Sequence, residues 1–189
     1  MDTFTVVLDA CVLYSAPLRD VILEIAAEGI FRPRWTDRIH EEWIAAVLKQ
    51  NARATPQALR RTRRLMDAAV PDALISGYEH LVQGLSLPDS NDQHVLAAAI
   101  IAKAGALVTF NTRDFPENAL EPFGIEAQHP DDFLVYQFDL AQAKVCTAIK
   151  RLRARLRSPP MSIDEYITCL ARQQLVQFAD RLLRFKALL

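Results

Sequence analysis

Cysteine, glycine and long apolar runs are scarce in this chain of 189 residues. Its cysteines, Cys11, Cys146 and Cys169, are isolated and odd in number, which argues against a disulfide scaffold or a cysteine zinc site. With 5 glycines and 51% hydrophobic residues, collagen-like and disordered chains are excluded. No uncharged apolar run reaches the roughly 18 residues of a membrane span, and no signal peptide is visible. We therefore expect a globular cytoplasmic protein that does not bind membranes.

Acidic residues are absent from two stretches, 43–66 and 140–163, although the net charge is only −1. Lysine and arginine accumulate in both. Such stretches are often the solvated faces of helices, but two of them in one chain suggest a polyanionic partner. The candidate contacts to such a partner are Arg60, Arg61, Arg63, Arg64, Arg151 and Arg153.

Short apolar strands alternate with long helical patterns in the first two thirds of the chain. Residues 4–8 and 106–110 are interpreted as buried strands, and 124–127 as a short edge strand. Helical spacing covers 18–28, 36–49, 56–64 and 92–103. Strands separated by long helices pair in parallel through right-handed crossovers. The pattern predicts an α/β domain over residues 1–132.

The pattern changes beyond residue 132. Residues 140–157 form one amphipathic helical pattern, which Pro159 and Pro160 break. Ser162 and Glu165 then have the spacing of a capping box that starts a last pair of helices. We predict an all-helical extension over residues 133–189.

Carboxylates follow both buried strands. Asp9 ends the first strand, Asp114 comes shortly after the second, and Asp92 opens the helix between them. In a parallel α/β sheet these positions share the rim where ligands bind. On the helix over 36–49, Glu42 adjoins the apolar stripe, whereas Glu41 points to the far side. We therefore predict that Glu42 joins the cluster.

Each of these acids has an ordinary structural alternative. Asp9 and Asp114 suit turns, Asp89 and Asp92 suit a helix N-terminus, and Glu42 could pair with an arginine. Together, however, they would repel, by about 4 kcal/mol for two carboxylates 4 Å apart at a dielectric of 20. Such a cluster needs a bound cation or protonated acids, and oxygen ligands favour Mg²⁺ or Mn²⁺. Of the histidines, His40, His80 and His129 lack ligand spacing, and His94 is expected to pack or to face solvent.

Three segments, 7–13, 87–99 and 108–116, together with the helix that carries Glu42, resemble the PIN-domain ribonucleases. The likeness is greatest to the VapC-type toxins of bacterial toxin–antitoxin systems, in the subgroup with a C-terminal helical extension. It implies a three-layer sandwich with a central parallel sheet flanked by helices. By position, Asp9, Glu42 and Asp92 match the first three acids of that family. The fourth position falls on Asn111 or Asp114, and we place the carboxylate on Asp114. By the same likeness, Asp89, Asn111 and Thr109 are candidate assisting residues.

The resemblance also implies a function. It predicts a toxin endoribonuclease that hydrolyses structured RNA such as tRNA, depends on Mg²⁺ or Mn²⁺, and leaves 5′-phosphate and 3′-hydroxyl ends. A VapB-type antitoxin and a homodimer are expected from the same likeness. The main alternative is a non-catalytic RNA-binding or scaffold protein. A phosphotransfer enzyme with an aspartyl nucleophile is disfavoured, because Cys11 stands where its second acid is needed. Cleavage of DNA rather than RNA stays open.

Overall fold

The structure is a computed structural model that describes residues 4–157 and 160–189. The chain divides into two compact units. The first comprises Met1–Tyr14 and Phe31–His129, and the second comprises Ser15–Ile30 and Pro130–Leu189. Among the described residues, no helix is long and apolar enough to cross a membrane. All three cysteines are free, as expected.

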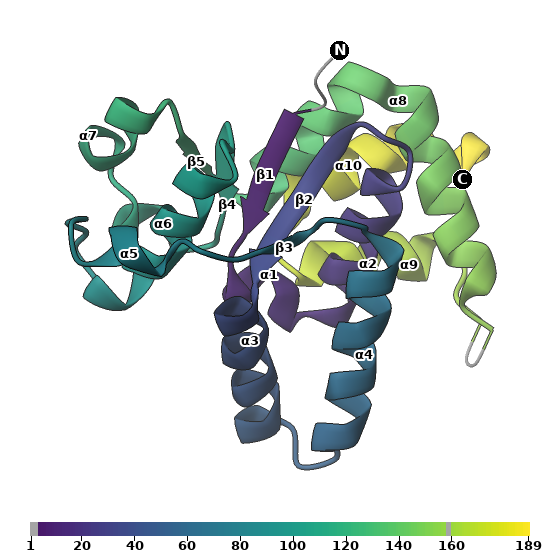
Figure 1. Cartoon of the computed structure of the whole chain (residues 1–189). Helices are drawn as coiled ribbons and strands as arrows, with labels where there is room; N and C mark the ends of the chain where they lie inside the picture. The colour runs from purple at the N-terminus through teal and green to yellow at the C-terminus, as the bar shows by residue number, and fades with distance from the viewer. Residues whose placement is uncertain (1–3, 158–159) are drawn as a thin grey trace. The chain divides into compact units, whose positions relative to one another are not determined.

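A five-stranded parallel sheet forms the centre of the first unit (Figure 1). The strand order is β3-β2-β1-β4-β5, and Val7 of β1 pairs with Arg34 of β2 on one side and Leu107 of β4 on the other. The predicted strands at 4–8 and 106–110 and the edge strand are present, the last one starting two residues later than expected. The strands are β1 (Phe4–Leu8), β2 (Phe31–Thr36), β3 (Leu74–Ile75), β4 (Ala106–Val108) and β5 (Glu126–Gln128).

Two strands were missing from the sequence interpretation. In β2, Pro33 and two arginines hide the apolar pattern. Proline is tolerated in a strand where one side is open, and β3 pairs only with Trp35 and Thr36. The stretch around Pro33 thus lies beyond the reach of β3. The strand β3 itself has two residues, too few for any periodicity.

Helices flank this sheet. The most buried is α6 (Gln93–Ile101), whose residues Val95 to Ala99 are excluded from solvent and which packs against β1 and β4. Its apolar character on every side predicted this position. The remaining helices and 3₁₀ turns of the unit are α1 (Ala10–Tyr14), α3 (Asp37–Gln50), α4 (Pro56–Ala69), α5 (Glu79–Val82), α7 (Glu117–Leu120), η1 (Ser90–Asp92), η2 (Thr112–Asp114) and η3 (Glu121–Phe123).

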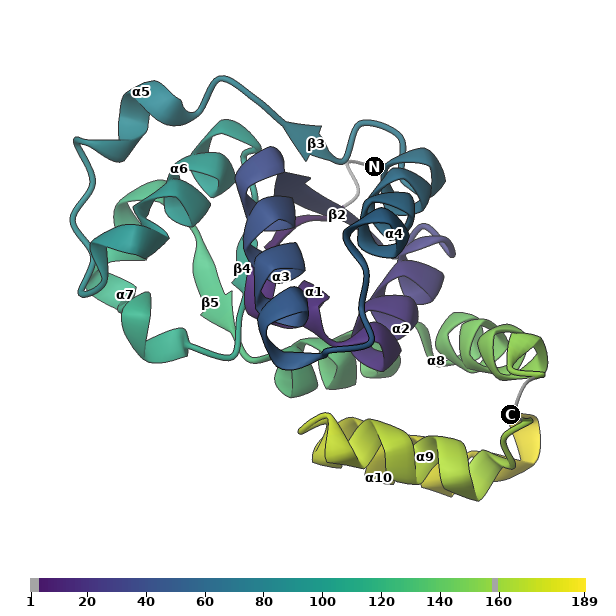
Figure 2. The ribbon, with the colours of Figure 1, turned by 90° about the horizontal axis from the view of Figure 1, so that it is seen from below.

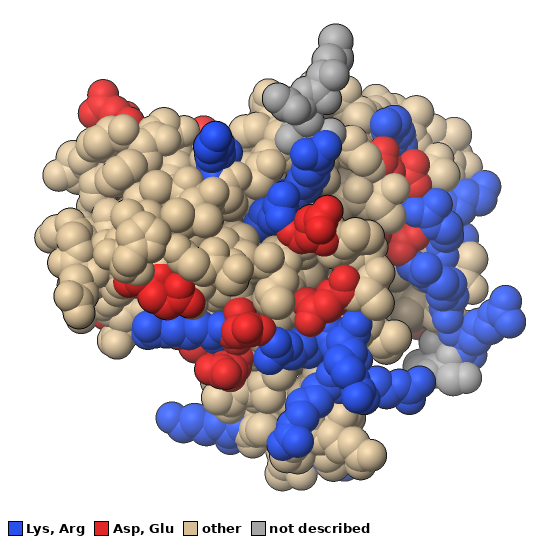
Figure 3. Space-filling model, in the orientation of Figure 1, with Lys and Arg blue, Asp and Glu red and all other residues tan. Residues whose placement is uncertain are grey.

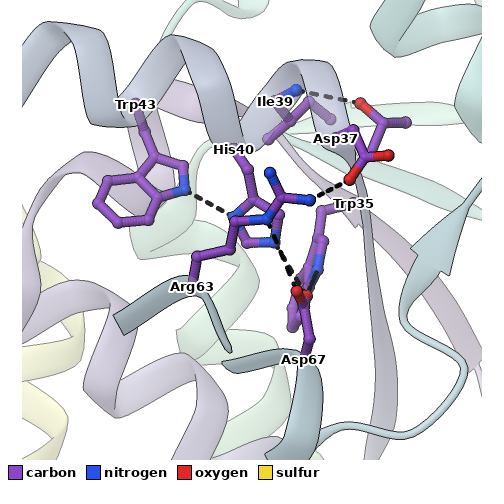
Figure 4. Close-up of polar contacts among 8 residues, drawn as sticks. Trp35, Asp37, Ile39, His40, Trp43, Arg63 and Asp67 are labelled. Carbon is purple, nitrogen blue, oxygen red and sulfur yellow. Dashed lines mark hydrogen bonds and ion pairs between the residues drawn. The ribbon is translucent and has the colours of Figure 1, made fainter. Parts of the chain in front are cut away.

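The helices α3 and α4 form a hairpin and lie side by side in two views (Figures 1 and 2). A polar network joins them at the end near the sheet (Figure 4). Asp67 of α4 accepts hydrogen bonds at Oδ1 from the indole of Trp35, at 2.8 Å, and from His40, whose Nε2 lies 3.0 Å away. The indole of Trp43 donates to Nδ1 of His40 at 2.9 Å. Since Nδ1 accepts, Nε2 carries the proton.

His40 is therefore a neutral bridge between the two helices. Its side chain is fully buried, and this burial lowers its pKa although Asp67 acts in the opposite direction. Arg63 of α4 adds ion pairs to Asp37 and, at 3.7 Å, to Asp67. The network fixes the first turns of α3, the helix that carries Glu42.

The second unit is helical. Its elements are α2 (Ala16–Ala26), α8 (Pro130–Arg155), α9 (Ile163–Arg172), α10 (Val176–Arg184) and η4 (Lys186–Leu188). The predicted helix at 140–157 is the second part of α8, which begins at Pro130 and is interrupted at Ala141, where φ is −143° and ψ is 51°. The capping box of Ser162 and Glu165 is present.

The packing of the second unit includes α2, which contacts α8 and α9. Glu24 of α2 is nearly buried and accepts ion pairs from Arg151 and Arg155 of α8. Compact units are not independently folding domains, so the predicted division after residue 132 stays a prediction.

Candidate active site

Asp9 lies at the carboxyl end of β1, beside the end of β4. Its backbone N–H donates to the carbonyl of Val108 at 3.1 Å. The carboxylate is nearly buried and receives three hydrogen bonds. The backbone N–H of Ala10 donates to Oδ1 at 2.6 Å, while the hydroxyl of Thr109 and the thiol of Cys11 donate to Oδ2 at 2.8 and 3.1 Å. Asp9 is therefore held in one orientation.

Thr109 and Cys11 support this orientation from two different segments. The hydroxyl of Thr109 is buried, donates to Asp9 and accepts the backbone N–H of Asn111 at 3.0 Å. Burial and the charge of Asp9 raise the pKa of Cys11 to about 12. The thiol thus stays protonated and remains a donor to Asp9 at neutral pH. Cys11 was not expected to belong to the site.

Asp92 is the acid whose pKa is affected by other acids of the site. It ends η1 and precedes α6, and its side chain makes no capping hydrogen bond. Burial and the negative charges of Asp9, Asp89 and Asp114 raise its pKa from 3.8 to about 6, against the opposing influence of His94. The charges of three other aspartates, from three segments of the chain, therefore act on Asp92. Glu42, which the sequence analysis placed in the same cluster, is not among them, so the four-acid cluster stays a prediction.

The neighbours of Asp92 differ in their local structure. Asp89 is exposed and caps η1, where it accepts the backbone N–H of Asn91 at 2.8 Å. Asp114 is half-buried in η2, and Asn111 is exposed just before that turn. Of the two residues considered for the fourth position, Asp114 is the one whose charge reaches Asp92. Because Asn111 carries no charge, the choice between the two residues stays a prediction.

Glu42 is engaged with two donors. Its Oε1 lies 3.0 Å from Nε2 of His94 and 3.1 Å from Nε of Arg38. Partial burial would raise the pKa of Glu42, but the hydrogen bonds and positive charges of His94 and Arg38 outweigh it and hold the pKa low. Glu41 is exposed on the other side of α3, so the predicted difference between the two glutamates is confirmed.

Of the two expected settings for His94, packing in the interior and exposure to solvent, the structure shows the first, with a polar contact that was not expected. Its side chain is 1% exposed and bonds to Glu42. A single histidine at the start of an otherwise apolar helix was the only signal for it. Arg38 stands four residues before Glu42, a spacing that brings two side chains together on a helix. The carbonyl of Asn91 accepts a further hydrogen bond from Arg38, at 3.4 Å.

The acids have the chemistry of divalent-cation ligands, but they do not form an assembled metal site among the described residues. Among residues 4–157 and 160–189, no three His, Cys, Asp or Glu side chains are arranged to enclose a metal ion. However, the negative charges of Asp9, Asp89 and Asp114 act on Asp92, and His94 opposes them. Carboxylate oxygens with excess negative charge match the preference of Mg²⁺ and Mn²⁺. The residues that would hold the ion are Asp9, Asp92 and Asp114, with Glu42 nearby.

The six candidate RNA-binding arginines divide into two groups. Arg60, Arg61 and Arg64 are exposed on α4, where Figure 3 shows basic side chains together. The other three take part in internal contacts. Arg63 pairs with Asp37 and Asp67, Arg151 pairs with Glu24 and Glu28, and Arg153 donates to the carbonyl of Leu189. A phosphate contact by these three would compete with an existing bond.

Comparison with known families agrees with this arrangement. The PIN domain family matches residues 5–113, more than half of the chain. The chain belongs to the PIN-domain family. Residues 130–184 match the VapC50 C-terminal domain, so the helical extension is similar to that domain.

One curated relative shares this resemblance. A protein of Mycobacterium tuberculosis named "Putative ribonuclease VapC50" is 36% identical over 109 residues, which are 58% of this chain and 63% of that protein. The matched part therefore spans less than two thirds of the relative. No solved structure matches the chain.

Proposed function

We propose that this PIN protein is a metal-dependent endoribonuclease and acts as a VapC-type toxin. The observation that carries the proposal is the setting of Asp92 before α6, where burial and the charges of Asp9, Asp89 and Asp114 together raise its pKa. A fold that only had to be stable would not gather four acids at one edge of a sheet, because their mutual repulsion is unfavourable. Membership of the PIN family and the printed name of the relative support the same activity.

The residues have distinct roles in this proposal. Asp9, fixed by Thr109 and Cys11, would hold the cation together with Asp92 and Asp114, and Glu42 would help to hold a second ion or orient the water. Mg²⁺ or Mn²⁺, when bound, lowers the pKa of water and offsets the charge of the scissile phosphate. The cluster thereby excludes the phosphodiester unless the cation is present, since four carboxylates repel a phosphate.

The proposed substrate is RNA, and the finer proposal is a structured RNA such as tRNA. Arg60, Arg61 and Arg64 are free to contact the phosphate backbone, because they are exposed on α4. Contacts of this kind contribute affinity without sequence specificity and weaken with salt. The proposed partner is a VapB-type antitoxin that restrains the toxin, and we further propose that the toxin forms a homodimer. Both follow from the VapC-type family.

The activity is tested with purified, metal-stripped chain and total RNA. Cleavage should require Mg²⁺ or Mn²⁺ and leave 5′-phosphate ends, which sequencing of the ligated products detects. Asp92→Asn and Glu42→Gln should each reduce the rate, Asp92→Asn by at least about 100-fold, the upper end of what outer-shell partners cost. The matched control is Glu41→Gln, which removes the same charge from the exposed side of α3 and should cleave like wild type.

Two outcomes would refute the proposal. RNA that stays intact with either metal, but is bound, would indicate the non-catalytic alternative. Cleavage that persists in Asp92→Asn at the wild-type rate would show that the activity lies elsewhere or in a contaminant. Faster cleavage of single-stranded DNA than of RNA would keep the metal site but change the substrate.

A further inference from the structure

His94 bonds the helix of Glu42 to the segment that carries Asp92. It is the second residue of α6 and lies two positions after Asp92. Its side chain is 1% exposed, and its Nε2 lies 3.0 Å from Oε1 of Glu42 on α3. This contact joins two elements that are separated by more than forty residues of sequence.

The environment of His94 indicates that the histidine serves Glu42. A carboxylate only accepts hydrogen bonds, so Nε2 of His94 must carry the proton. The other ring nitrogen, Nδ1, is buried and has no hydrogen-bond partner among the described residues. A buried, unsatisfied nitrogen is unfavourable, and an apolar side chain would fill this position without that cost. The bond to Glu42 is the contact that an apolar residue could not supply.

Arg38 completes a two-sided anchor. Its Nε donates to the same Oε1 of Glu42 at 3.1 Å, and its terminal nitrogen reaches the carbonyl of Asn91 at 3.4 Å. Both recorded donors therefore use one carboxylate oxygen. Oε2 has no recorded partner within the described part of the chain and is left available. Arg38 is nearly half exposed, so water competes for its hydrogen bond to Glu42. The hydrogen bond of His94 to Glu42 is shielded from water.

We propose that His94 is a positioning residue for the phosphodiester cleavage: it anchors Oε1 of Glu42 to the Asp92 segment and leaves Oε2 to act on the water or cation. This inference rests on the proposed function. Loss of the anchor allows the Glu42 side chain to rotate, which lowers the rate without removing any carboxylate. Outer-shell partners of this kind typically contribute 10- to 100-fold to activity or metal affinity.

The test compares two substitutions that differ by one methylene group. In His94→Gln the amide nitrogen extends to about the position of Nε2, and in His94→Asn it does not. We expect His94→Gln to cleave RNA within about 3-fold of wild type and His94→Asn to be 10- to 100-fold slower. His94→Leu, which suits an apolar setting, is the second variant without a donor at the position of Nε2 should His94→Asn fail to fold, and both variants are called donor-free below. Circular dichroism checks the fold of each.

Two further readouts separate positioning from general damage. If His94 acts through Glu42, adding His94→Asn to Glu42→Gln should slow cleavage by less than about 3-fold beyond Glu42→Gln alone. In metal-free urea unfolding, the same double-mutant cycle should show a coupling of about fivefold or more in the equilibrium constant. Multiplicative losses in rate, or a coupling below twofold, would overturn the inference.

The outcomes also distinguish this inference from the proposed function. A wild-type chain that cleaves while the folded donor-free variants cleave equally well overturns the role of His94 alone. Equal losses in His94→Gln and His94→Asn also overturn it, because the donor would then not be what matters. A wild-type chain that leaves RNA intact with both metals overturns the proposed function and the role of His94 with it.

Discussion

Replacing Asp92 by asparagine should stabilise the metal-free chain even though it abolishes cleavage. In the folded chain, burial and the charges of Asp9, Asp89 and Asp114 raise the pKa of Asp92 from 3.8 to about 6. In the unfolded chain this carboxyl has its ordinary pKa. Above pH 6 the Asp92 carboxylate is therefore charged in both states, but its charge is less favourable in the folded protein than in the unfolded chain. Asparagine removes this unfavourable charge.

The expected gain in unfolding free energy follows from the size of the rise in the pKa of Asp92. A change from 3.8 to about 6 corresponds to at most about 3 kcal/mol, at 1.36 kcal/mol per pKa unit. Asp92 is only half-buried, so water screens much of this, and about 1 kcal/mol is a realistic expectation. The attraction of the α6 N-terminus for negative charge, about 0.3–1 kcal/mol, reduces it further.

Because the pKa of Asp92 is raised rather than lowered, the stability gained by Asp92→Asn should depend on pH in a specific way. A group with a raised pKa in the folded state contributes stability below its unfolded pKa and loses that contribution as the pH rises through the folded value. The advantage of Asp92→Asn should therefore grow between pH 4 and 6 and be constant above about pH 7. At pH 5 it should be smaller than at pH 8.

Urea unfolding in the presence of a chelator measures the effect. The fluorescence of Trp35 and Trp43, the two tryptophans of the chain, reports on the first unit. Glu41→Gln, which removes an exposed acid outside the cluster, should change the unfolding free energy by less than about 0.5 kcal/mol at either pH. Two results would contradict the repulsion between the acids. One is an Asp92→Asn variant that is less stable than wild type at pH 8. The other is a difference in unfolding free energy between variant and wild type that is the same at pH 5 and at pH 8.

Two other residues give independent tests. Asp67→Ala leaves the ring N–H of His40 and the indole N–H of Trp35 without their acceptor. Urea unfolding should therefore show that Asp67→Ala lowers the unfolding free energy by about 2–3 kcal/mol, and that Asp67→Asn lowers it less. A loss below about 0.5 kcal/mol for Asp67→Ala would mean that water replaces the carboxylate. Cys11, with its pKa raised to about 12 by burial and Asp9, should react with iodoacetamide at pH 8.5 at least about 100-fold more slowly in the folded chain than in urea. Equal rates, read by mass spectrometry, would contradict the bond to Asp9.

Most of the α/β unit could be predicted because its sequence signals are local. The strand β1 is a β-branched run that ends at Asp9, and α6 is apolar on all sides. For such elements the sequence pattern predicts both the type of secondary structure and its burial. In contrast, β2 contains Pro33 and two arginines, and its assignment depends on pairing with β1 along the backbone. Side-chain patterns carry no information about that pairing.

The grouping of α2 with the C-terminal helices could not be predicted for a similar reason. An amphipathic stripe shows that a helix has a buried face but not which element covers it. The stripe of α2 is clear in the sequence, yet its contacts are with α8 and α9. The ion pairs of Glu24 with Arg151 and Arg155 span more than 120 residues of sequence. These pairs also show why counting arginines overestimated the surface available for RNA.

At the site, the acids were predictable and their partners were not. Position after a strand or before a buried helix was enough to select Asp9, Asp92 and Asp114. The donors that orient the acids depend on side-chain contacts across elements, as between His94 and Glu42. No periodicity encodes such a contact.

Asp9, Glu42 and Asp92 differ in the donors that neutralise them, and this difference makes a test with a cation decisive. Asp9 has three donors and Glu42 has two, whereas Asp92 has a raised pKa and no capping bond. A cation should therefore relieve mainly the repulsion at Asp92. At a hundredfold excess over its Kd, Mn²⁺ should stabilise the wild type by about 2.7 kcal/mol, more than the about 1 kcal/mol that Asp92→Asn gains without metal. The order of stability should thus invert between chelator and saturating Mn²⁺. A variant that had only lost a favourable charge at the N-terminus of α6 would be the less stable one in both conditions.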